Sequence, residues 1–464
     1  MSDGSIPTIV TGLRHGFRQG ITRPEAWRRG QLEALRRMLQ ERASDFEAAL
    51  AADLGKSGTE AQLTEIGFVI GEVDHALAHL SSWMRPRRVT APPAIQPASA
   101  RIVPEPLGVA LIIAPWNYPL MLALSPLVGA IAAGDAAIVK PSELAPATSA
   151  ALALLVPQYL DRRAIAIVEG GAEETAELLA QRFDHIFYTG GGRVGRIVAR
   201  AAAEHLTPIT LELGGKSPAY VDGTVAPAAA AKRIAWAKFL NAGQTCVAPD
   251  YVLGTRETLD RLAPASAGAI HDLYGNAVRR NPDYGRIVND AHFERLVSYL
   301  GDGEIVAGGG RDAAERFIEP TVLSVADRDS AVMRDEIFGP VLPLVEVADL
   351  DDAIDFVAGR DKPLAAYVFS DDAGVRQRWT AETSSGALTF GAPILHLTVP
   401  DLPFGGVGES GQGAYHGERS FRVFSHEKAV LAKPLTPDTL GPTIMPPFTG
   451  RKDRLVRQWL GRLR

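Results

Sequence analysis

Apolar residues follow two patterns along this chain, short uninterrupted runs and longer stretches with helical spacing. The uninterrupted runs have the length of strands, and segments of helix length separate them. A strand that is apolar on both faces is buried on both faces, which is typical of a parallel sheet covered by helices. We therefore predict an α/β protein with a doubly wound parallel sheet, whose first strands are residues 109–114, 136–139, 164–168 and 185–188.

The segment before this sheet has the spacing of three helices. Thr22, followed three residues later by Glu25, predicts a capping box at the start of the first helix. The second helix occupies about residues 44–54 and stops at Gly55. We expect these helices to cover the sheet. Their apolar faces are Trp27, Leu32, Leu35 and Leu39 in the first helix and Ile66, Ile70, Val73, Leu77 and Leu80 in the third.

A change of composition marks residues 85–106, which contain six prolines and short alternating pieces. This composition predicts an extended arm, and residues 421–431 predict a second arm strand. A second alternation of strands and helices runs to about residue 390, so we predict a second doubly wound parallel sheet after a boundary near residue 212. The glycine-rich stretch 301–316 is predicted to be a surface loop.

Composition narrows the class of protein. A chain of 464 residues with 46% hydrophobic residues can bury the cores of two domains. Its net charge of -6 offers no basic field, so we expect no nucleic-acid partner and a small-molecule ligand instead. The single cysteine excludes a disulfide framework within the chain, and no basic and then apolar leader follows Met1, so we expect a cytoplasmic protein.

Two apolar segments bear on membrane contact. Residues 120–133 are apolar over only 14 residues, which is too few to span a bilayer, and they predict a buried core helix. Residues 451–464 fit either a terminal helix packed on its own protein, which we favour, or a helix that docks on a membrane surface. This last segment is basic and carries Leu455, Val456, Trp459, Leu460 and Leu463 at helical spacing.

Cys246 is the main candidate for chemistry. A lone cysteine is usually an inert, buried, small apolar residue. Here an apolar helical stretch, residues 234–240, ends just before the cysteine and places the thiol on a turn. Upstream, Glu212 and Asn117 are each bracketed by glycine or proline. A thiol, a carboxylate and a carboxamide on rigid turns form a set typical of covalent catalysis.

A glycine-rich turn, residues 189–195, follows the fourth predicted strand and opens a helix. Gly190 and Gly195 fit the pattern G-x-G-x-x-G, which alone is a weak signal. Between a strand and a helix, however, the free backbone amides of such a turn can hold a pyrophosphate. Lys140 and Glu143 follow an earlier strand, where they fit either a grip on ribose hydroxyls or an ordinary solvated ion pair.

With these residues in view, the chain resembles the aldehyde dehydrogenase superfamily, and its class 3 branch most of all. The likeness runs from about residue 20 to about residue 433, and residues 247–251 and 413–417 carry the class 3 likeness together with the short N-terminal region. Five motifs in family order carry the resemblance: Pro-Trp-Asn-Tyr-Pro at 115–119, Lys-Pro-Ser-Glu at 140–143, Leu-Glu-Leu-Gly-Gly-Lys at 211–216, Gly-Gln-Thr-Cys at 243–246 and Glu-Ile-Phe-Gly-Pro at 336–340.

The resemblance implies NAD(P)-dependent oxidation of aldehydes to carboxylic acids. Cys246 would attack the aldehyde carbon as a thiolate, which near neutral pH requires a lowered pKa. The Asn117 carboxamide and the backbone amide of Cys246 would hold the oxyanion. Glu212 would be the general base that activates water to hydrolyse the thioester. Aromatic residues implied at the aldehyde entrance favour apolar, medium-chain aliphatic or aromatic substrates; they are Tyr118, Trp236 and Phe404.

The resemblance also implies a cofactor, NAD or NADP, and no metal. The residues implied to hold it are Lys140 and Glu143 at the adenosine ribose, Gly190 and Gly195 at the phosphates, and Glu336 and Phe338 at the nicotinamide ribose. Phe338 also fits a core aromatic. The implied domains are a Rossmann-like dinucleotide-binding domain (1–84 and 107–211), a catalytic domain (212–400), an oligomerisation arm (85–106 and 418–433) that predicts a homodimer, and a C-terminal extension (434–464).

Two positions depart from the class 3 pattern. Gly191-Gly192 stands where relatives usually carry a small polar pair, which leaves only backbone amides for the phosphates. Gly391-Ala392 replaces a common Asn-Asp before the stretch leading to His396. The catalytic trio is intact, but two other hypotheses remain open: a cysteine esterase that uses the same thiol, and a catalytically idle dinucleotide-binding protein.

Overall fold

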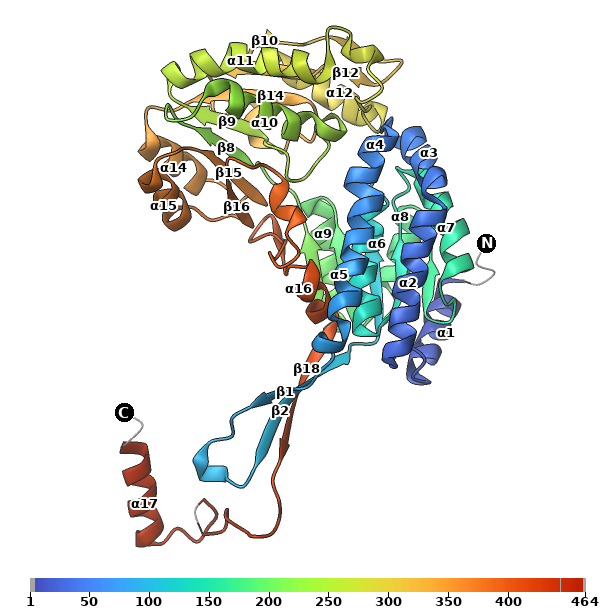
Figure 1. Ribbon diagram of the computed structural model, residues 1–464, viewed down its shortest axis with the longest axis vertical. Coiled ribbons are helices and arrows are strands. Elements are labelled where there is room, and N and C mark those ends of the chain that lie inside the picture. The colour runs from blue at the N-terminus through green and yellow to red at the C-terminus, as the bar shows by residue number, and fades with distance from the viewer. Residues whose placement is uncertain (1–4, 443, 462–464) are drawn as a thin grey trace.

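The computed structural model describes residues 5–442 and 444–461, and it contains two sheet-centred bodies and a protruding arm (Figure 1). The first body is built on a six-stranded sheet with strand order β17-β7-β6-β3-β4-β5, in which only β17 is antiparallel to its neighbour. The predicted parallel α/β class is confirmed. The strands are β3 (Val109–Ile113), β4 (Ala136–Lys140), β5 (Ile165–Ile167), β6 (His185–Thr189), β7 (Ile209–Glu212) and β17 (Gly411–Gln412).

Helices cover this sheet, as predicted. Helix α6 packs on β3 and β4, and α2 and α5 pack outside it, while α1 contacts β3 and β4 directly. Every residue of α6 is buried, which confirms the predicted core helix. The helices of this body are α1 (Ile6–Arg18), α2 (Glu25–Glu41), α3 (Ala43–Leu54), α4 (Gly58–Ala61), the π-helix η1 (Gln62–Ile66), α5 (Gly67–Trp83), α6 (Met121–Ala133), α7 (Pro146–Tyr159), α8 (Ala172–Leu179) and α9 (Gly192–Ala203).

The capping box predicted at Thr22 is wrong. Helix α2 begins at Glu25 after Pro24, and no side chain caps it. Thr22 is fully buried instead, and its hydroxyl has no partner among the described residues. The Glu25 carboxylate does not turn back to Thr22, because it binds Arg29 at 2.8 Å and the hydroxyl of Ser81 at 2.5 Å. The tertiary contact with α5 therefore replaces the local cap.

The second body is built on a seven-stranded sheet with order β10-β13-β14-β9-β8-β15-β16, parallel except for the edge strand β10. Its strands are β8 (Pro218–Val221), β9 (Tyr251–Gly254), β10 (Glu304–Ala307), β13 (Thr321–Val325), β14 (Val341–Glu346), β15 (Ala365–Phe369) and β16 (Ala387–Phe390), with the small pair β11 (Arg311–Asp312) and β12 (Phe317–Ile318) beside them. Its helices are α10 (Pro227–Phe239), α11 (Arg256–Tyr274), α12 (Asp290–Ser298), α13 (Ala331–Arg334), α14 (Leu350–Ala358) and α15 (Ala373–Glu382).

The prediction of a loop over residues 301–316 is wrong in part, because β10 and β11 lie within it. Strand β10 is an edge strand whose residues are exposed or half-buried, so it lacks the apolar pattern of a central strand. Its antiparallel pairing with β13 supplies the hydrogen bonds that hold it. Glycines at both ends of the strand hid it in the sequence.

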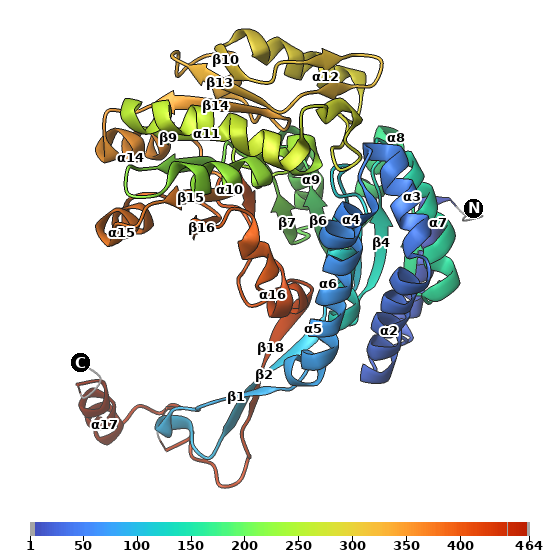
Figure 2. The same cartoon turned by 45° about the horizontal axis from the view of Figure 1, so that its top comes forward.

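The arm is a three-stranded sheet in which β2 (Ser99–Pro106) lies between β1 (Arg87–Val89) and β18 (Ser425–Ala432). Figure 2 shows it projecting away from both larger sheets. The predicted second arm strand starts later than expected, because Gly417–Val423 forms helix α16, which packs on α6 and α5. Between α16 and the second body, the chain returns to the first sheet as β17.

The C-terminal segment forms helix α17 (Gly450–Gly461), which lies beyond the arm and away from both larger sheets (Figures 1 and 2). Packing of this helix on the protein's own core, the interpretation favoured from the sequence, is therefore wrong for its described residues. Leu455 is 53% exposed, and Lys452 holds the helix to the carbonyls of Gly441 and Met445. The predicted position Leu463 lies outside the described residues, as do the side chains of Trp459 and Leu460. Among the described helices, none is long and apolar enough to span a bilayer.

Candidate active site

The turn that carries Cys246 follows α10 and a 3₁₀ turn, Leu240–Gly243. Asn241 and Ala242 both take left-handed backbone conformations, with φ of 51° and 52°, which side chains disfavour. Gly243, at φ 75°, has no room for a side chain, because a Cβ there would collide with the carbonyl of Gly339. Such strained backbone persists only where surrounding structure holds it. Here it leads into Cys246, which is half-buried.

Asn117 lies next to this turn, as the sequence suggested. Its side-chain nitrogen donates to the carbonyl of Gln244 at 3.1 Å, and its own carbonyl accepts from Asn241 at 2.8 Å. The hydroxyls of Tyr118 and Thr245 lie 2.6 Å apart. A carboxamide nitrogen carries two N–H groups, so the bond to Gln244 uses one of them and the other remains available as a donor.

Glu212 ends strand β7 and is only 3% exposed. Neither of its carboxyl oxygens has a hydrogen-bond partner among the described residues. Burial raises the pKa of this carboxyl well above its usual range, and the charge of Glu212 in turn contributes to raising the pKa of Cys246. A buried carboxyl group with no partner is a functional candidate, because fold stability alone does not explain it.

The pKa of Cys246 is raised to about 12, first by burial and then by the negative charges of Glu336 and Glu212. The backbone amides of Cys246 and Val247 act in the opposite direction, but more weakly. The lowered pKa that the sequence led us to expect is therefore wrong for this structure. The thiol is protonated near neutral pH, and a base must remove its proton before it can attack a carbonyl carbon.

Glu336 and Phe338 belong to a segment that packs against the turns that carry Asn117 and Glu212. Phe338 adopts a left-handed conformation, φ 50°, and its ring meets the edge of Trp116 at 5.3 Å between centroids. The Glu336 carboxylate lies against Gly214, where a Cβ would collide with it. Burial raises the pKa of Glu336 to about 8. The interpretation of Phe338 as a simple core aromatic does not account for its strained backbone.

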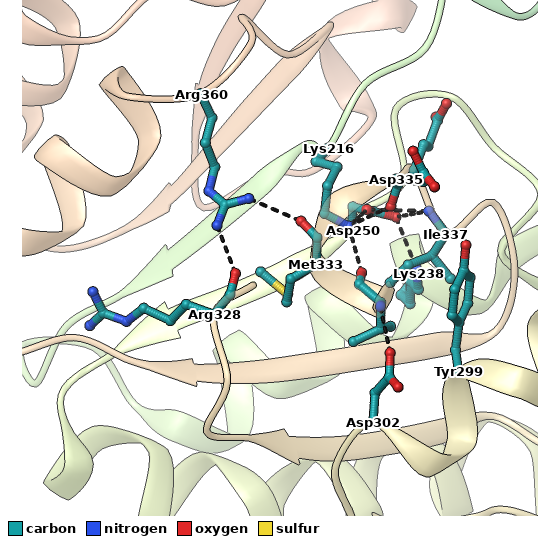
Figure 3. A network of polar contacts seen from close by, with 12 residues as sticks. Lys216, Lys238, Asp250, Tyr299, Asp302, Arg328, Met333, Asp335, Ile337 and Arg360 are labelled. Atoms are coloured by element: carbon teal, nitrogen blue, oxygen red, sulfur yellow. Dashed lines mark hydrogen bonds and ion pairs between the residues drawn. The ribbon is translucent and has the colours of Figure 1, made fainter. Parts of the chain in front are cut away.

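A buried charge network that the sequence did not reveal holds this segment (Figure 3). Lys216 donates to Asp250 at 2.6 Å and to the carbonyls of Val332 and Asp335 at 2.8 Å each. Asp250 also accepts the backbone N–H of Ile337 at 3.1 Å. Lys216 and Asp250 stand inside two of the quoted motifs, which was the only signal for them. Lys238, fully buried, lies 3.7 Å from Asp250, and its burial lowers its pKa to about 8.

The glycine-rich turn lies where β6 meets α9, whose N-cap, Gly191, offers no side chain. Gly190 donates its N–H to the carbonyl of Glu212 at 3.0 Å, so this turn is tied to the strand end that carries the candidate base. A Cβ on Gly195 would lie 2.9 Å from Leu213, which shows close packing of helix on strand. The amides at this helix start and the absence of side chains fit a bound pyrophosphate.

Lys140 ends strand β4, and its buried ammonium group binds the half-exposed carboxylate of Glu143 at 2.7 Å. The carboxyl ends of β4, β6 and β7 share one edge of the sheet, so this pair, the glycine-rich turn and Glu212 all face the same side of the body. The residue types present therefore fit a dinucleotide. An ion pair of this kind fits both a ribose-binding site and an ordinary surface contact, so it does not decide between these two interpretations of Lys140 and Glu143.

The three aromatic residues expected at a substrate entrance differ in their surroundings. Tyr118 is buried beside Thr245, and Trp236 is half-buried on α10, where no hydrogen bond or ring contact among the described residues ties it to the site. Phe404 is buried and packs on Tyr415 at 5.6 Å and His416 at 5.2 Å between ring centroids. The charges of Glu212 and Cys246 act on the Tyr415 hydroxyl, so Tyr415 belongs to the site although sequence reasoning gave it no role.

Comparison with known proteins now bears on the chain as a whole. The sequence profile of the aldehyde dehydrogenase family matches residues 10–430. The chain belongs to the aldehyde dehydrogenase family. It is 50% identical to aldehyde dehydrogenase family 3 member A2 of Rattus norvegicus, over 96% of this chain and 92% of that one. The fold matches the substrate-bound state of Staphylococcus aureus AldH with a TM-score of 0.96 and 42% identity, covering 98% of this chain and all of that one.

A solved Mycobacterium tuberculosis aldehyde dehydrogenase complexed with NAD+ is similar at 28% identity, with a TM-score of 0.84 over 93% of this chain and 90% of that one. The class 3 resemblance read from the motifs agrees with the family 3 relative. As an aldehyde dehydrogenase, the protein is an NAD(P)-dependent enzyme that oxidises aldehydes.

The departure at Gly391 costs this fold little, because Gly391 takes φ 68°, a conformation that asparagine also tolerates.

Proposed function

We propose that this aldehyde dehydrogenase oxidises apolar aldehydes, medium-chain aliphatic or aromatic, through covalent catalysis by Cys246. The observation that carries the proposal is the union of three turns: Asn117 is hydrogen-bonded to the Cys246 turn, and the unpartnered Glu212 carboxyl acts electrostatically on the same thiol. The buried rings of Tyr118, which is bonded to Thr245, and of Phe404, which packs on Tyr415, favour apolar substrates.

The proposed chemistry follows from these groups. Glu212, whose raised pKa makes its ionised form a strong base, takes the proton of the Cys246 thiol. The thiolate attacks the aldehyde carbon, and the Asn117 N–H and the Cys246 amide hold the resulting oxyanion. A bound nicotinamide would supply the hydride acceptor, and loss of hydride from the carbon would leave a thioester on Cys246. Once Glu212 has released the first proton to solvent, it takes a proton from water, and the resulting hydroxide adds to the thioester carbon; the C–S bond then breaks, the carboxylic acid leaves, and the Cys246 sulfur takes the proton back from Glu212.

For the cofactor, we propose contacts from Lys140 and Glu143 to the adenosine ribose, from the Gly190–Gly195 turn to the phosphates, and from Glu336 and Phe338 to the nicotinamide ribose. The free helix start and the ion pair at the sheet edge support the first two contacts. The strained backbone of Phe338 and the network behind Glu336 support the third. The division into a dinucleotide-binding part and a catalytic part is supported by the two separate sheets.

The test measures reduced-nicotinamide formation on a panel of aliphatic and aromatic aldehydes, with NAD and NADP in parallel. Cys246→Ala should abolish turnover while dinucleotide still binds, and Glu212→Gln should slow both the first turnover and the steady state, because it removes the base for both steps. Retained turnover by Cys246→Ala would overturn the covalent route. Cleavage of activated esters without oxidation of any aldehyde would identify an esterase, and dinucleotide binding without turnover would identify an idle binding protein.

We also propose a homodimer joined through the arm. The arm sheet projects from the rest of the chain, and the residues of its outer strand β1 are all exposed, which supports a partner there. Light scattering at micromolar concentration should give about twice the 49.5 kDa of one chain. A mass equal to one chain would refute this.

A cytoplasmic location, supported by the single unpaired cysteine, is tested by following a tagged protein in its own cell.

A further inference from the structure

A fully buried ion pair lies behind the Asn117 turn. Lys56 follows the C-terminus of α3, and Glu65 stands on the π-helix η1; the side chains of both residues are 0% exposed. The Lys56 Nζ donates to Glu65 Oε1 at 2.5 Å. Removing two charges from water costs several kcal/mol per ion unless their geometry and remaining hydrogen bonds compensate, so a buried pair is poor evidence of stabilisation by itself. The question is what the pair touches.

Within the part of the chain that the structure describes, the other hydrogen bonds of the two side chains all go to one short stretch of backbone. Lys56 Nζ donates to the carbonyl of Asn117 at 3.1 Å. Glu65 Oε2 accepts the N–H of Leu120 at 2.9 Å and that of Met121 at 3.0 Å. The ammonium also lies 3.9 Å from the centre of the Tyr118 ring. The pair therefore binds the turn of residues 117–121 at both ends. Lys56 binds the carbonyl at its start, and Glu65 binds two amides at its end.

The local backbone is specialised for this contact. A π-helix is rare and is found mostly as a single widened turn at functional sites. Here it spans Gln62–Ile66 and places Glu65 against the start of α6. The widened turn requires Gly67, because a Cβ there would lie 2.6 Å from the carbonyl oxygen of Gln62. The Glu65 carboxylate also accepts from the first amides of α6, where a negative charge is favourable.

We propose that Lys56 and Glu65 are positioning residues, which fix the Asn117 turn so that its carboxamide points at the oxyanion formed on Cys246. This inference rests on the proposed role of Asn117. Stabilisation of an oxyanion requires a donor held in place before charge develops. Among the described residues, the Asn117 side chain has only its bond to Gln244 to orient it, so the backbone below it must be rigid. Neither Lys56 nor Glu65 contacts the reacting atoms.

The key variant is the neutral double substitution Lys56→Met with Glu65→Gln. It removes both charges of the pair, and the glutamine oxygen can still accept from the amides of α6, so the chain should fold. It removes the donor to the Asn117 carbonyl. We expect the rate of the first turnover with benzaldehyde and NAD to fall roughly tenfold to a hundredfold, less than the roughly hundredfold to thousandfold loss expected when an oxyanion donor is removed outright. KM and dinucleotide affinity should change less than threefold.

Two comparisons make the result decisive. In an Asn117→Ala background the double substitution should have no further effect on the first-turnover rate, because the group it positions is gone. An equal fall in both backgrounds, or a wild-type rate in the double variant, would overturn the proposal. If Asn117→Ala itself leaves the rate unchanged, the proposed oxyanion role of Asn117 is wrong. Any loss of rate caused by the double substitution would then be independent of Asn117, and the positioning proposal would be overturned as well.

A matched control separates positioning from stability. Arg14 and Asp184 form an ion pair that is only partly buried, at 2.8 Å, and Asp184 likewise accepts a backbone N–H, that of Val109 at 2.8 Å. That pair lies at the amino end of β3, at the opposite edge of the sheet from the site. Arg14→Met with Asp184→Asn should lower Tm with no change in the first-turnover rate. If both double variants lose rate in proportion to their loss of Tm, the Lys56 pair is merely structural.

Discussion

The hydroxyl of Tyr118 lies 2.6 Å from that of Thr245, and this bond joins the turn of the oxyanion candidate to the turn of the nucleophile candidate. Both residues are buried. The two turns come from different bodies, Asn117 following β3 of the first sheet and Cys246 preceding β9 of the second. The catalytic geometry is therefore set where the two bodies meet, and local contacts between them should control the rate.

Tyr118→Phe tests this contact. Loss of a buried hydrogen bond worth about 1.4 kcal/mol should lower kcat/KM about tenfold. Thr245→Val should have a similar effect, and the double variant should be little worse than either, with a coupling of about 1 kcal/mol in a double-mutant cycle. Tyr159→Phe is the control, because that hydroxyl binds Glu41 at the surface, at 2.8 Å. Additive losses in the cycle would show that the two hydroxyls act separately.

Electrostatics at Cys246 predict how the free enzyme reacts with iodoacetamide. The charge of Glu336, whose pKa is about 8, helps to raise the pKa of the thiol to about 12. At pH 9 Glu336 is ionised, so Glu336→Gln removes a negative charge, lowers the thiol pKa and raises the thiolate fraction. Alkylation should become at least threefold faster, and the wild-type rate should still rise between pH 8 and 10. Exposed Glu409→Gln should change nothing; a slower reaction of Glu336→Gln would contradict the assignment.

The phosphate turn predicts a gain of affinity. Nothing lies within 4 Å of a Cβ built on Gly191, and its backbone, φ -75° and ψ 148°, is ordinary for a helix N-cap. Gly191→Ser should therefore fit without strain and add a hydroxyl beside the amides that would hold the phosphates. We expect the dissociation constant for the dinucleotide to fall twofold to tenfold, measured by fluorescence titration. Gly223→Ser, at another open glycine, is the control. Weaker binding of Gly191→Ser would show that the turn is closed to side chains.

Glu72 predicts a pH dependence of stability. Its burial raises the pKa of the carboxyl from 4.5 to about 7. Between these pH values the folded protein keeps a proton that the unfolded chain has released, so the free energy of unfolding falls as pH rises, by ~3 kcal/mol over the window. Glu72→Gln should remove this fall, giving a higher Tm than the wild type at pH 8 and an equal Tm at pH 4.5. Exposed Glu33→Gln should follow the wild type at both pH values. Equal Tm values at pH 8 would refute the assignment.

Much of the fold was readable from the sequence because its signals are local. A strand such as Ala136–Lys140 is buried on both faces, so its composition alone predicts a parallel sheet. Helix ends at positive-φ glycines, such as Gly55, are equally local. The edge strand β10 and the start of α2 were missed because pairing with β13 and contact with α5 decide them, and neither partner is near in sequence.

The sequence by itself indicated covalent catalysis, because a nucleophile, an amide and a carboxylate on rigid turns are chemical types fixed by residue identity, and its resemblance to a known family implied the oxidation of aldehydes. It also placed Cys246, Asn117 and Glu212 as candidates. Only the tertiary structure decided the state of the thiol, since burial and the charges of Glu336 and Glu212 raise its pKa, and only it revealed Lys56, Glu65 and Asp250 as supports of the site. Dielectric surroundings and hydrogen bonds between distant residues exist only once the chain has folded.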